Sequence, residues 1–148
     1  MITEKEICAF LKEQKMAYNE GSSVWGNRLK AKRKRPVTPS YVFGSVTTAI
    51  ALWCYVLNMN GDGLTLVATH GREGTINEEG LLCIPWKDIR RITYKKYWDS
   101  YELYADTSRG VFGCRIPKRV KGCRWHRKNV KKFMETCRKG AYPANHTK

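Results

Sequence analysis

Acidic residues are scarce in this chain of 148 residues: 13 Asp or Glu stand against 28 Lys or Arg, which leaves a formal net charge of +15. Such an excess makes a compact chain repel itself unless an anionic partner offsets the charge. The balance therefore predicts a partner from one of three classes, namely nucleic acid, an anionic membrane surface or an acidic protein. The hydrophobic share of 42% argues against a chain that is disordered throughout.

A secretion signal is also lacking, because the first ten residues, MITEKEICAF, contain no apolar core of the kind that signal peptides carry. We therefore expect a cytoplasmic protein whose cysteines are reduced thiols, several of them at positions that suit a small buried hydrophobe. The cysteines are Cys8, Cys54, Cys83, Cys114, Cys123 and Cys137.

Signatures of catalysis are few. The chain has only three histidines, and it contains no Gly-rich phosphate loop, no nucleophile elbow and no paired metal-binding histidines. Four carboxylates on expected hairpins would form a nuclease-type site only if the fold brought them together. They are Asp88, Asp99, Glu102 and Asp106. We expect no enzyme activity and no cofactor.

Two cysteine-based alternatives stay open. Cys123 lies between Lys121 and Arg124, and cations of this kind lower the pKa of a thiol, but no catalytic triad accompanies it. A structural zinc site would need four ligands from the C-terminal third of the chain, where the spacing Cys-x2-His occurs once without a second knuckle. These ligands would be Cys114, Cys123, His126 and Cys137. We expect no metal.

Cations are concentrated in residues 115–139, RIPKRVKGCRWHRKNVKKFMETCRK, which hold eleven Lys or Arg and a single acid, Glu135. Apolar residues recur there with a period of about 3.6, which predicts an amphipathic helix that packs on a sheet or barrel and turns its cations outward. The apolar stripe consists of Trp125, Val130, Phe133, Met134 and Cys137. A solvated face without a ligand is the alternative.

A second basic segment covers residues 27–40, NRLKAKRKRPVTPS, in which six cations meet no acid and two prolines prevent a continuing helix. We expect an extended or mobile arm that becomes ordered along phosphates or lipid headgroups. The segment also resembles a nuclear localisation run, and a linker that only adds solubility is the alternative.

The N-terminal residues predict a helix. Thr3 and Glu6 match the capping box, and the apolar spacing that follows extends the helix to about residue 18. Its narrow stripe, expected to pack on the rest of the chain, comprises Ile7, Phe10, Leu11, Gln14 and Tyr18.

Residues 41–57, YVFGSVTTAIALWCYVL, carry no charge. A transmembrane helix needs roughly 20 apolar residues, so this run is short, and its Val, Thr, Ile, Trp and Tyr favour strands. We expect one or two buried strands with a break near residues 47–49, and a membrane span is the alternative.

Turn signals then recur at residues 60–63, 71–74, 77–80 and 106–110, and Pro85 blocks strand pairing at its own nitrogen. The strands expected between them cover residues 64–69, 81–84, 89–97, 100–105 and 111–116. Short strands with no helical pattern between them predict an α+β fold. In this fold an antiparallel meander forms a small barrel or sandwich, capped by the C-terminal amphipathic helix, with an additional N-terminal helix.

The meander, the corner from Ile84 to Ile89 (IPWKDI), two further hairpin strands and a closing helix together resemble the pleckstrin-homology-like (PH-like, GRAM-like) domains of bacteria and their mobile elements. The resemblance covers roughly residues 41–138. It implies an orthogonal barrel with one open end plugged by the final helix, and binding of lipid headgroups, peptides or proteins instead of catalysis. The basic arm and the N-terminal helix depart from the family pattern.

Three segments are therefore predicted: residues 1–40 with the N-terminal helix and basic connector, residues 41–139 with the barrel and C-terminal helix, and a polar tail at residues 140–148. We expect a binding module that holds a polyanion, nucleic acid first, by contacts to the phosphate backbone. Peripheral binding to anionic membrane lipid is one alternative. A mobile-element protein or inhibitor that acts on the acidic surface of a host enzyme is the other.

The predicted phosphate contacts come from the basic arm and from the start of the C-terminal helix. They are Arg33, Lys34, Arg35, Lys118, Arg119, Lys121, Arg124, Arg127, Lys128, Lys131 and Lys132. Exposed aromatic rings among the cations would stack on unpaired bases, with core packing as the alternative for each ring. The candidate rings are Trp25, Tyr94, Tyr97 and Trp98.

Overall fold

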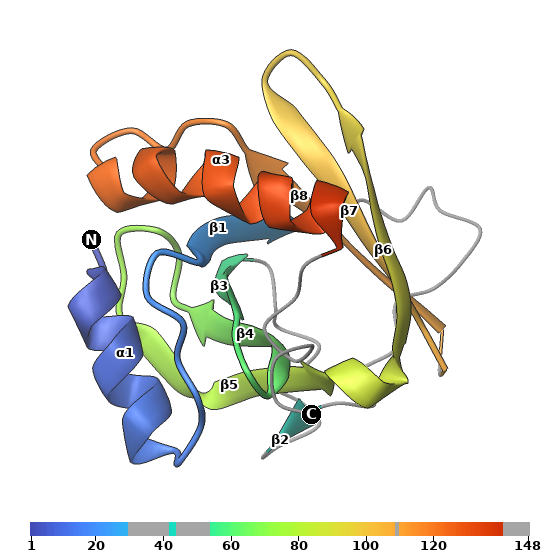
Figure 1. The fold of residues 1–148 in the computed structure, drawn as a ribbon. Coiled ribbons are helices and arrows are strands. Elements are labelled where there is room, and N and C mark those ends of the chain that lie inside the picture. Colours follow the sequence, from blue (N-terminus) through green and yellow to red (C-terminus); the bar gives the residue numbers. More distant parts are fainter. Residues whose placement is uncertain (30–41, 44–53, 109, 141–148) are drawn as a thin grey trace.

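The computed structural model describes residues 1–29, 42–43, 54–108 and 110–140. Within these residues an antiparallel sheet is accompanied by one α-helix near each end of the chain, which makes the fold α+β as predicted (Figure 1). The helices are α1 (Glu4–Glu13), the 3-10 helix η1 (Trp86–Asp88) and α3 (Arg124–Lys139). The strands are β1 (Ser23–Arg28), β2 (Val42–Phe43), β3 (Cys54–Met59), β4 (Gly63–Thr69), β5 (Ile76–Pro85), β6 (Ile89–Lys96), β7 (Ser100–Thr107) and β8 (Gly110–Pro117).

The sheet order among the described strands is β2-β5-β4-β3-β1-β8-β7-β6. One meander runs from β1 through β3 and β4 to β5, and a second runs from β6 through β7 to β8. β1 joins them: it pairs with β3 from Ser23 to Asn27, but with β8 only at Asn27 and Arg28. The two halves of the sheet are therefore held together by the C-terminal end of β1 and diverge along its N-terminal part.

β1 was not predicted from the sequence, in which the N-terminal helix was expected to end near residue 18 and the basic segment to begin at residue 27. The strand includes a glycine, which has low strand propensity. Gly26 is required by packing, because a Cβ atom there would lie 2.5 Å from Leu57 Cδ1 and 2.9 Å from Tyr55 Cε1. Pairing with strands that follow much later in the chain overrides the weak local signal.

Both faces of the first meander are buried, and the alternation of side chains along its strands supplies two separate cores. In β3, Tyr55 and Leu57 belong to the main core between the sheet halves, whereas Val56 belongs to a second core on the opposite face. In β4, Leu66 and Val67 divide in the same way. This two-sided burial explains why β3 and β4 carry no charged side chain.

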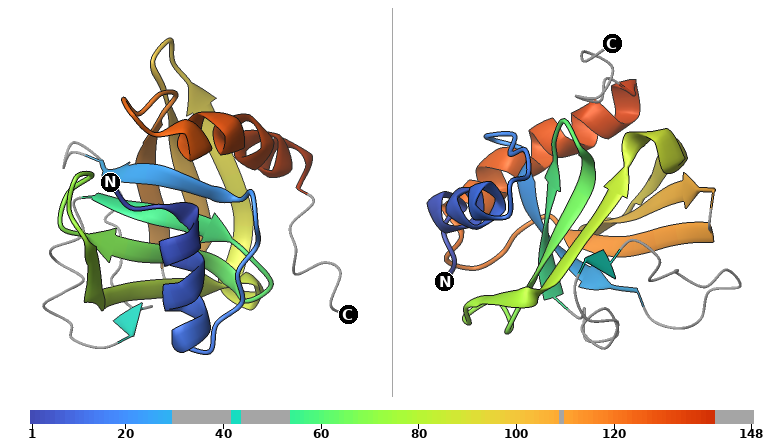
Figure 2. Two further views of the ribbon diagram at one scale, coloured as in Figure 1. Left: turned by 90° about the vertical axis from the view of Figure 1, so that its left-hand side faces the viewer. Right: turned by 90° about the horizontal axis from the view of Figure 1, so that it is seen from below.

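α1 covers the second core, as Figures 1 and 2 show from three directions. The predicted capping box is confirmed: the Glu6 backbone N–H donates to Thr3 Oγ1 and the Thr3 backbone N–H donates to Glu6 Oε1, each at 3.2 Å. Ile7, Phe10 and Leu11 are buried, as their spacing predicted.

The helix ends at Glu13 and not near residue 18, so the predicted C-terminus of α1 was wrong. Lys15 adopts a left-handed conformation with φ of 59°. Its backbone N–H donates to Lys12 O at 2.9 Å, and the N–H of Met16 donates to Leu11 O at 2.9 Å, which is the Schellman arrangement that closes a helix. A glycine usually marks this position, and its absence removed the signal.

The hairpin turn at residues 60–63 is confirmed between β3 and β4, although only Gly63 of its two glycines has a positive φ. The turn predicted at residues 77–80 was wrong, because these residues lie within β5. The strands predicted at residues 64–69, 81–84, 89–97, 100–105 and 111–116 are confirmed with ends that shift by a few residues. Of the uncharged run 41–57, β2 and β3 are strands, and residues 41 and 44–53 lie outside the described residues.

Candidate functional site

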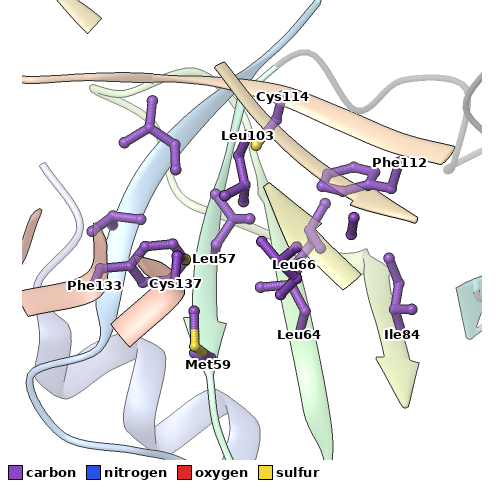
Figure 3. Packing of buried hydrophobic residues seen from close by; sticks show 14 of the residues in the cluster. Leu57, Met59, Leu64, Leu66, Ile84, Leu103, Phe112, Cys114, Phe133 and Cys137 are labelled. Atoms are coloured by element: carbon purple, nitrogen blue, oxygen red, sulfur yellow. The ribbon is translucent and has the colours of Figure 1, made fainter. Parts of the chain in front are cut away.

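α3 packs its apolar stripe on the sheet, as its spacing predicted. Phe133 is fully buried and Met134 is 4% exposed, and both belong to the main core. Figure 3 shows Phe133 and Cys137 reaching from α3 toward Leu57. The helix runs from Arg124 to Lys139, slightly longer at each end than the predicted stripe.

Two polar side chains on the inner face of α3 fasten it to β1. The Trp25 backbone N–H donates to His126 Nδ1 at 3.0 Å, and Asn129 Nδ2 donates to the Ser23 carbonyl at 3.0 Å. Residues 23–25 of β1 are paired with β3 but not with β8, so these side chains satisfy backbone groups on the edge that β8 leaves open. This role was not predicted from the sequence, since polar residues within an apolar stripe have no periodic signal.

His126 also reaches β8, because its Nε2 lies 2.6 Å from the Pro117 carbonyl. Since Nδ1 accepts a hydrogen bond from a backbone N–H, Nε2 carries the proton and the ring is neutral. Burial lowers the pKa of His126, and the nearby Arg72 guanidinium acts in the same direction. Both ring nitrogens are therefore engaged by backbone, and the described residues contain no group of three or more His, Cys, Asp or Glu arranged to hold a metal ion.

The outer face of α3 is cationic from its first residue. Arg124, Arg127, Lys128, Lys131 and Lys132 are all exposed. The one acid of the helix, Glu135, lies further along, where it accepts hydrogen bonds from Arg138 and lies 3.7 Å from the Lys139 amine. The last turn is thus partly neutralised, whereas the first three turns present positive charge without an acid on the helix.

The segment between β8 and α3 adds further cations and ties them to the β6–β7 hairpin. The Lys118 backbone N–H donates to the Asp99 carbonyl at 3.0 Å, and its Nζ lies 5.4 Å from the centre of the Tyr101 ring. Arg119 and Lys121 are exposed. We call the cations of this segment and of the first three turns of α3 the basic face. It comprises Lys118, Arg119, Lys121, Arg124, Arg127, Lys128, Lys131 and Lys132.

The basic face thus contains every predicted phosphate contact from the C-terminal part of the chain. Arg33, Lys34 and Arg35, the contacts predicted from the basic arm, lie outside the described residues. Within the described residues, all eight members lie on one continuous stretch of chain, with Lys118 partly buried and the other seven exposed.

The β6–β7 hairpin projects beyond α3 on the side of the sheet that α3 covers (Figures 1 and 2). Its tip exposes Tyr97 by 42% and Trp98 by 90%, whereas Trp25 is fully buried and Tyr94 is half-buried. Of the four rings considered from the sequence, two therefore belong to the core or its margin, and two are accessible.

Two of the four carboxylates considered for a nuclease-type site are engaged by other side chains. Asp99 forms an ion pair with Arg115 at 2.9 Å, and Glu102 accepts a hydrogen bond from the Tyr104 hydroxyl at 2.6 Å. Burial raises the pKa of the Cys123 thiol, which favours the protonated form over a nucleophilic thiolate. Cys123 belongs to the second core, so burial outweighs the effect of the neighbouring cations on its pKa that the sequence left open as an alternative.

All six cysteines are free thiols, and Cys83, Cys114, Cys123 and Cys137 are buried, as expected of small hydrophobes. None of the helices in the described ranges has an apolar run long enough to cross a bilayer. Comparison with known proteins gave no match to a family model, to a curated sequence or to a solved structure.

Proposed function

We propose that this protein is a non-enzymatic module that binds nucleic acid through its phosphate backbone, with the basic face as the contact surface. The observation that carries the proposal is the alignment of exposed cations along the first three turns of α3, with no acid among them. Their positions are fixed by the buried side of the same helix, where His126 and Asn129 bind the backbone of β1. A rigid row of cations suits a polyanion better than scattered charges do.

Nucleic acid is favoured over an anionic membrane because the basic face has no exposed apolar side chains to insert into a bilayer. An interfacial helix binds a membrane by inserting its apolar side chains below the headgroups. The apolar side of α3 is already packed in the main core, and its outer face carries only charged residues. A membrane would therefore gain charge attraction from α3 but no apolar burial.

The proposed scaffold is a PH-like barrel in which the two halves of the sheet pack across the main core and α3 fills the open side. Three observations support it. β1 pairs with both halves, β5 passes to β6 through the corner η1, and side chains from both halves share the main core with Phe133. In this arrangement the barrel is a support for the basic face, and the inner cavity is filled by side chains.

The test uses the triple variant Arg127→Gln, Lys128→Gln, Lys131→Gln, in which three exposed cations become neutral while the helix-forming tendency is kept. Binding to a mixed-sequence oligonucleotide is measured by electrophoretic mobility shift at rising NaCl concentration. We expect the slope of log affinity against log salt to fall by about 2 to 3 units, since each lost phosphate contact removes roughly 0.7 to 0.9 of a counterion.

The matched control is the variant Lys5→Gln, Lys12→Gln, Lys87→Gln, which loses the same charge at exposed positions outside the basic face. It is expected to keep most of the wild-type slope and affinity. Equal losses of affinity and slope in the two variants would show that binding depends on the net charge of the protein and not on the basic face. Wild-type protein that shifts no oligonucleotide at low salt would refute the proposed function.

A further inference from the structure

We propose that the tip of the β6–β7 hairpin stacks on unpaired bases through Trp98, assisted by Tyr97, so that the protein prefers single-stranded or looped nucleic acid to duplex. This inference rests on the proposed function and specifies its ligand. The basic face would hold the phosphates in either case, whereas only an unpaired base offers its flat side to an indole ring.

Trp98 is the most exposed large hydrophobic residue among the described ones. Its side chain is 90% exposed, and its neighbour Tyr97 is 42% exposed. Apart from Met1, these two are the only large hydrophobic residues of the described ranges that are exposed. Every other described tryptophan is buried or half-buried, so the two adjacent exposed rings form a distinct feature of the surface.

Several contacts hold the tip in one conformation. The Tyr97 backbone N–H donates to the Ser100 carbonyl at 2.8 Å, which closes the turn. Asp99 is fixed by Arg115 at 2.9 Å, and Arg115 Nε also donates to Ser100 Oγ at 3.2 Å. The backbone that carries Trp98 is therefore ordered before a base binds, which reduces the conformational entropy lost on stacking.

The tip and the basic face are directly connected. Lys118, the first residue of the basic face, donates its backbone N–H to the Asp99 carbonyl, one residue from Trp98. Lys118 Nζ lies over the ring of Tyr101, whose cross-strand partner is the exposed Lys96. Lys96 thus precedes the exposed rings and Lys118 contacts the same hairpin, so cations lie near a base that stacks at the tip. Two acids lie there as well: Asp99 is paired with Arg115, and Glu102 accepts a hydrogen bond from the Tyr97 hydroxyl at 3.4 Å.

A lipid surface is the competing ligand, since tryptophan also favours the membrane interface. The structure argues against it because the exposed apolar area near the basic face is confined to one hairpin tip. An experiment can distinguish the two partners, because stacking on a base requires an aromatic ring at position 98, whereas insertion into a lipid surface requires only a large apolar side chain.

The test compares wild-type protein with Trp98→Ala, Trp98→Phe and Trp98→Leu. Fluorescence anisotropy measures binding of each to a labelled mixed-sequence single strand and to the duplex of the same length, at several salt concentrations. We expect Trp98→Ala to weaken single-strand binding by about 10-fold to 100-fold, to leave duplex binding within about 2-fold, and to leave the salt slope unchanged, since stacking releases no counterions. Trp98→Phe should restore much of the affinity and Trp98→Leu little.

Two results would overturn the inference. Trp98→Ala that binds single strand and duplex as tightly as wild type would show that the ring contacts no base. Trp98→Leu that binds as well as Trp98→Phe would show a contact that does not require a ring, and vesicles of phosphatidylcholine with phosphatidylserine then test for lipid. In either case the slope change of the Arg127, Lys128 and Lys131 variant reports separately on the proposed function. Because Trp98 is 90% exposed, its replacement is expected to leave the circular dichroism spectrum unchanged.

Discussion

His126 shows how a single side chain can set the position of a whole surface. Its two ring nitrogens bind the backbone of β1 and β8 at the place where these strands diverge, and its own helix carries the basic face on the opposite side. A second inward residue, Asn129, lies one turn further along and binds the same strand. The cations between them, Arg127 and Lys128, are directed outward by the geometry of the helix.

Stability should depend on pH through His126. Because its pKa in the folded state is lowered below the ordinary value of about 6.5, the unfolded chain takes up a proton at a higher pH than the folded chain does. The stabilising contribution is therefore complete above about pH 7 and is lost as pH falls below about 6.5. We expect the free energy of unfolding in urea to decrease between pH 7 and pH 5, by at most about 1.4 kcal/mol per pH unit.

The measurement pairs urea unfolding with the NMR titration of the His126 ring in the folded protein. A His126 titration midpoint at or above 6.5 would contradict the assignment of a neutral, buried ring. The variant His126→Asn replaces the imidazole with an amide, which can still donate and accept hydrogen bonds but cannot take up a proton in this range. It is expected to be less stable at pH 7 and to show a smaller change in stability between pH 7 and pH 5.

At the scale of single residues, the sequence predicted the outward cations well and the inward polar residues not at all. Arg127 and Lys131 are exposed because charged side chains are rarely buried without a partner, a rule that needs no knowledge of the fold. His126 and Asn129 are buried because the fold supplies unpaired backbone groups at one strand edge. That requirement exists only once β1 and β8 have come together.

Among the elements, α3 joins the core to the proposed binding surface. Its apolar side packs against strands from both halves of the sheet, and its N-terminal end is bound to the residues that precede α1, where Trp125 Nε1 donates to the Ile2 carbonyl at 3.1 Å. Trp125 also stacks on Trp25 with ring centres 5.9 Å apart. The helix therefore has little freedom to move relative to the sheet.

Removal of the central anchor of α3 tests this view. Phe133 is fully buried, and Phe133→Ala is expected to lower the free energy of unfolding by about 3 to 5 kcal/mol, because it removes apolar contacts and leaves a cavity. The matched control is Lys131→Ala, two residues earlier on the exposed face, which should change stability by less than about 0.5 kcal/mol. Urea unfolding followed by circular dichroism measures both. A cost for Phe133→Ala as small as that of Lys131→Ala would mean that α3 is not docked in solution.

For the molecule as a whole, the charges are separated along the sequence. Eight of the 13 acids lie before residue 80, in α1, β5 and the loops before β1, β4 and β5, whereas residues 115–139 contain one acid and eleven cations. The C-terminal segment therefore has a single acid of its own, Glu135, to offset the charge of the basic face. Self-repulsion within the basic face is a cost that the packing of α3 must offset.

Salt should accordingly stabilise the folded protein. Raising NaCl from about 0.01 M to about 0.1 M shortens the Debye length from about 30 Å to about 10 Å and weakens repulsion between the crowded cations. We expect the thermal unfolding midpoint to rise over this range, and to rise less in the Arg127→Gln, Lys128→Gln, Lys131→Gln variant. A midpoint that falls with NaCl, or the same rise in both proteins, would contradict repulsion centred on the basic face.

The sequence alone determined the α+β class, most of the strands, the amphipathic character of α3 and the residues of α3 that face water, because these follow from local periodicity, turn residues and the cost of burying charge. Only the tertiary structure decided that residues 23–28 form the strand joining the two halves, that α1 ends at Glu13, and that Trp98 stays exposed while Trp25 is buried. Trp25 and Trp98 are the same residue type in extended or turn segments. Their environments differ because contacts from distant parts of the chain cover one ring and leave the other open.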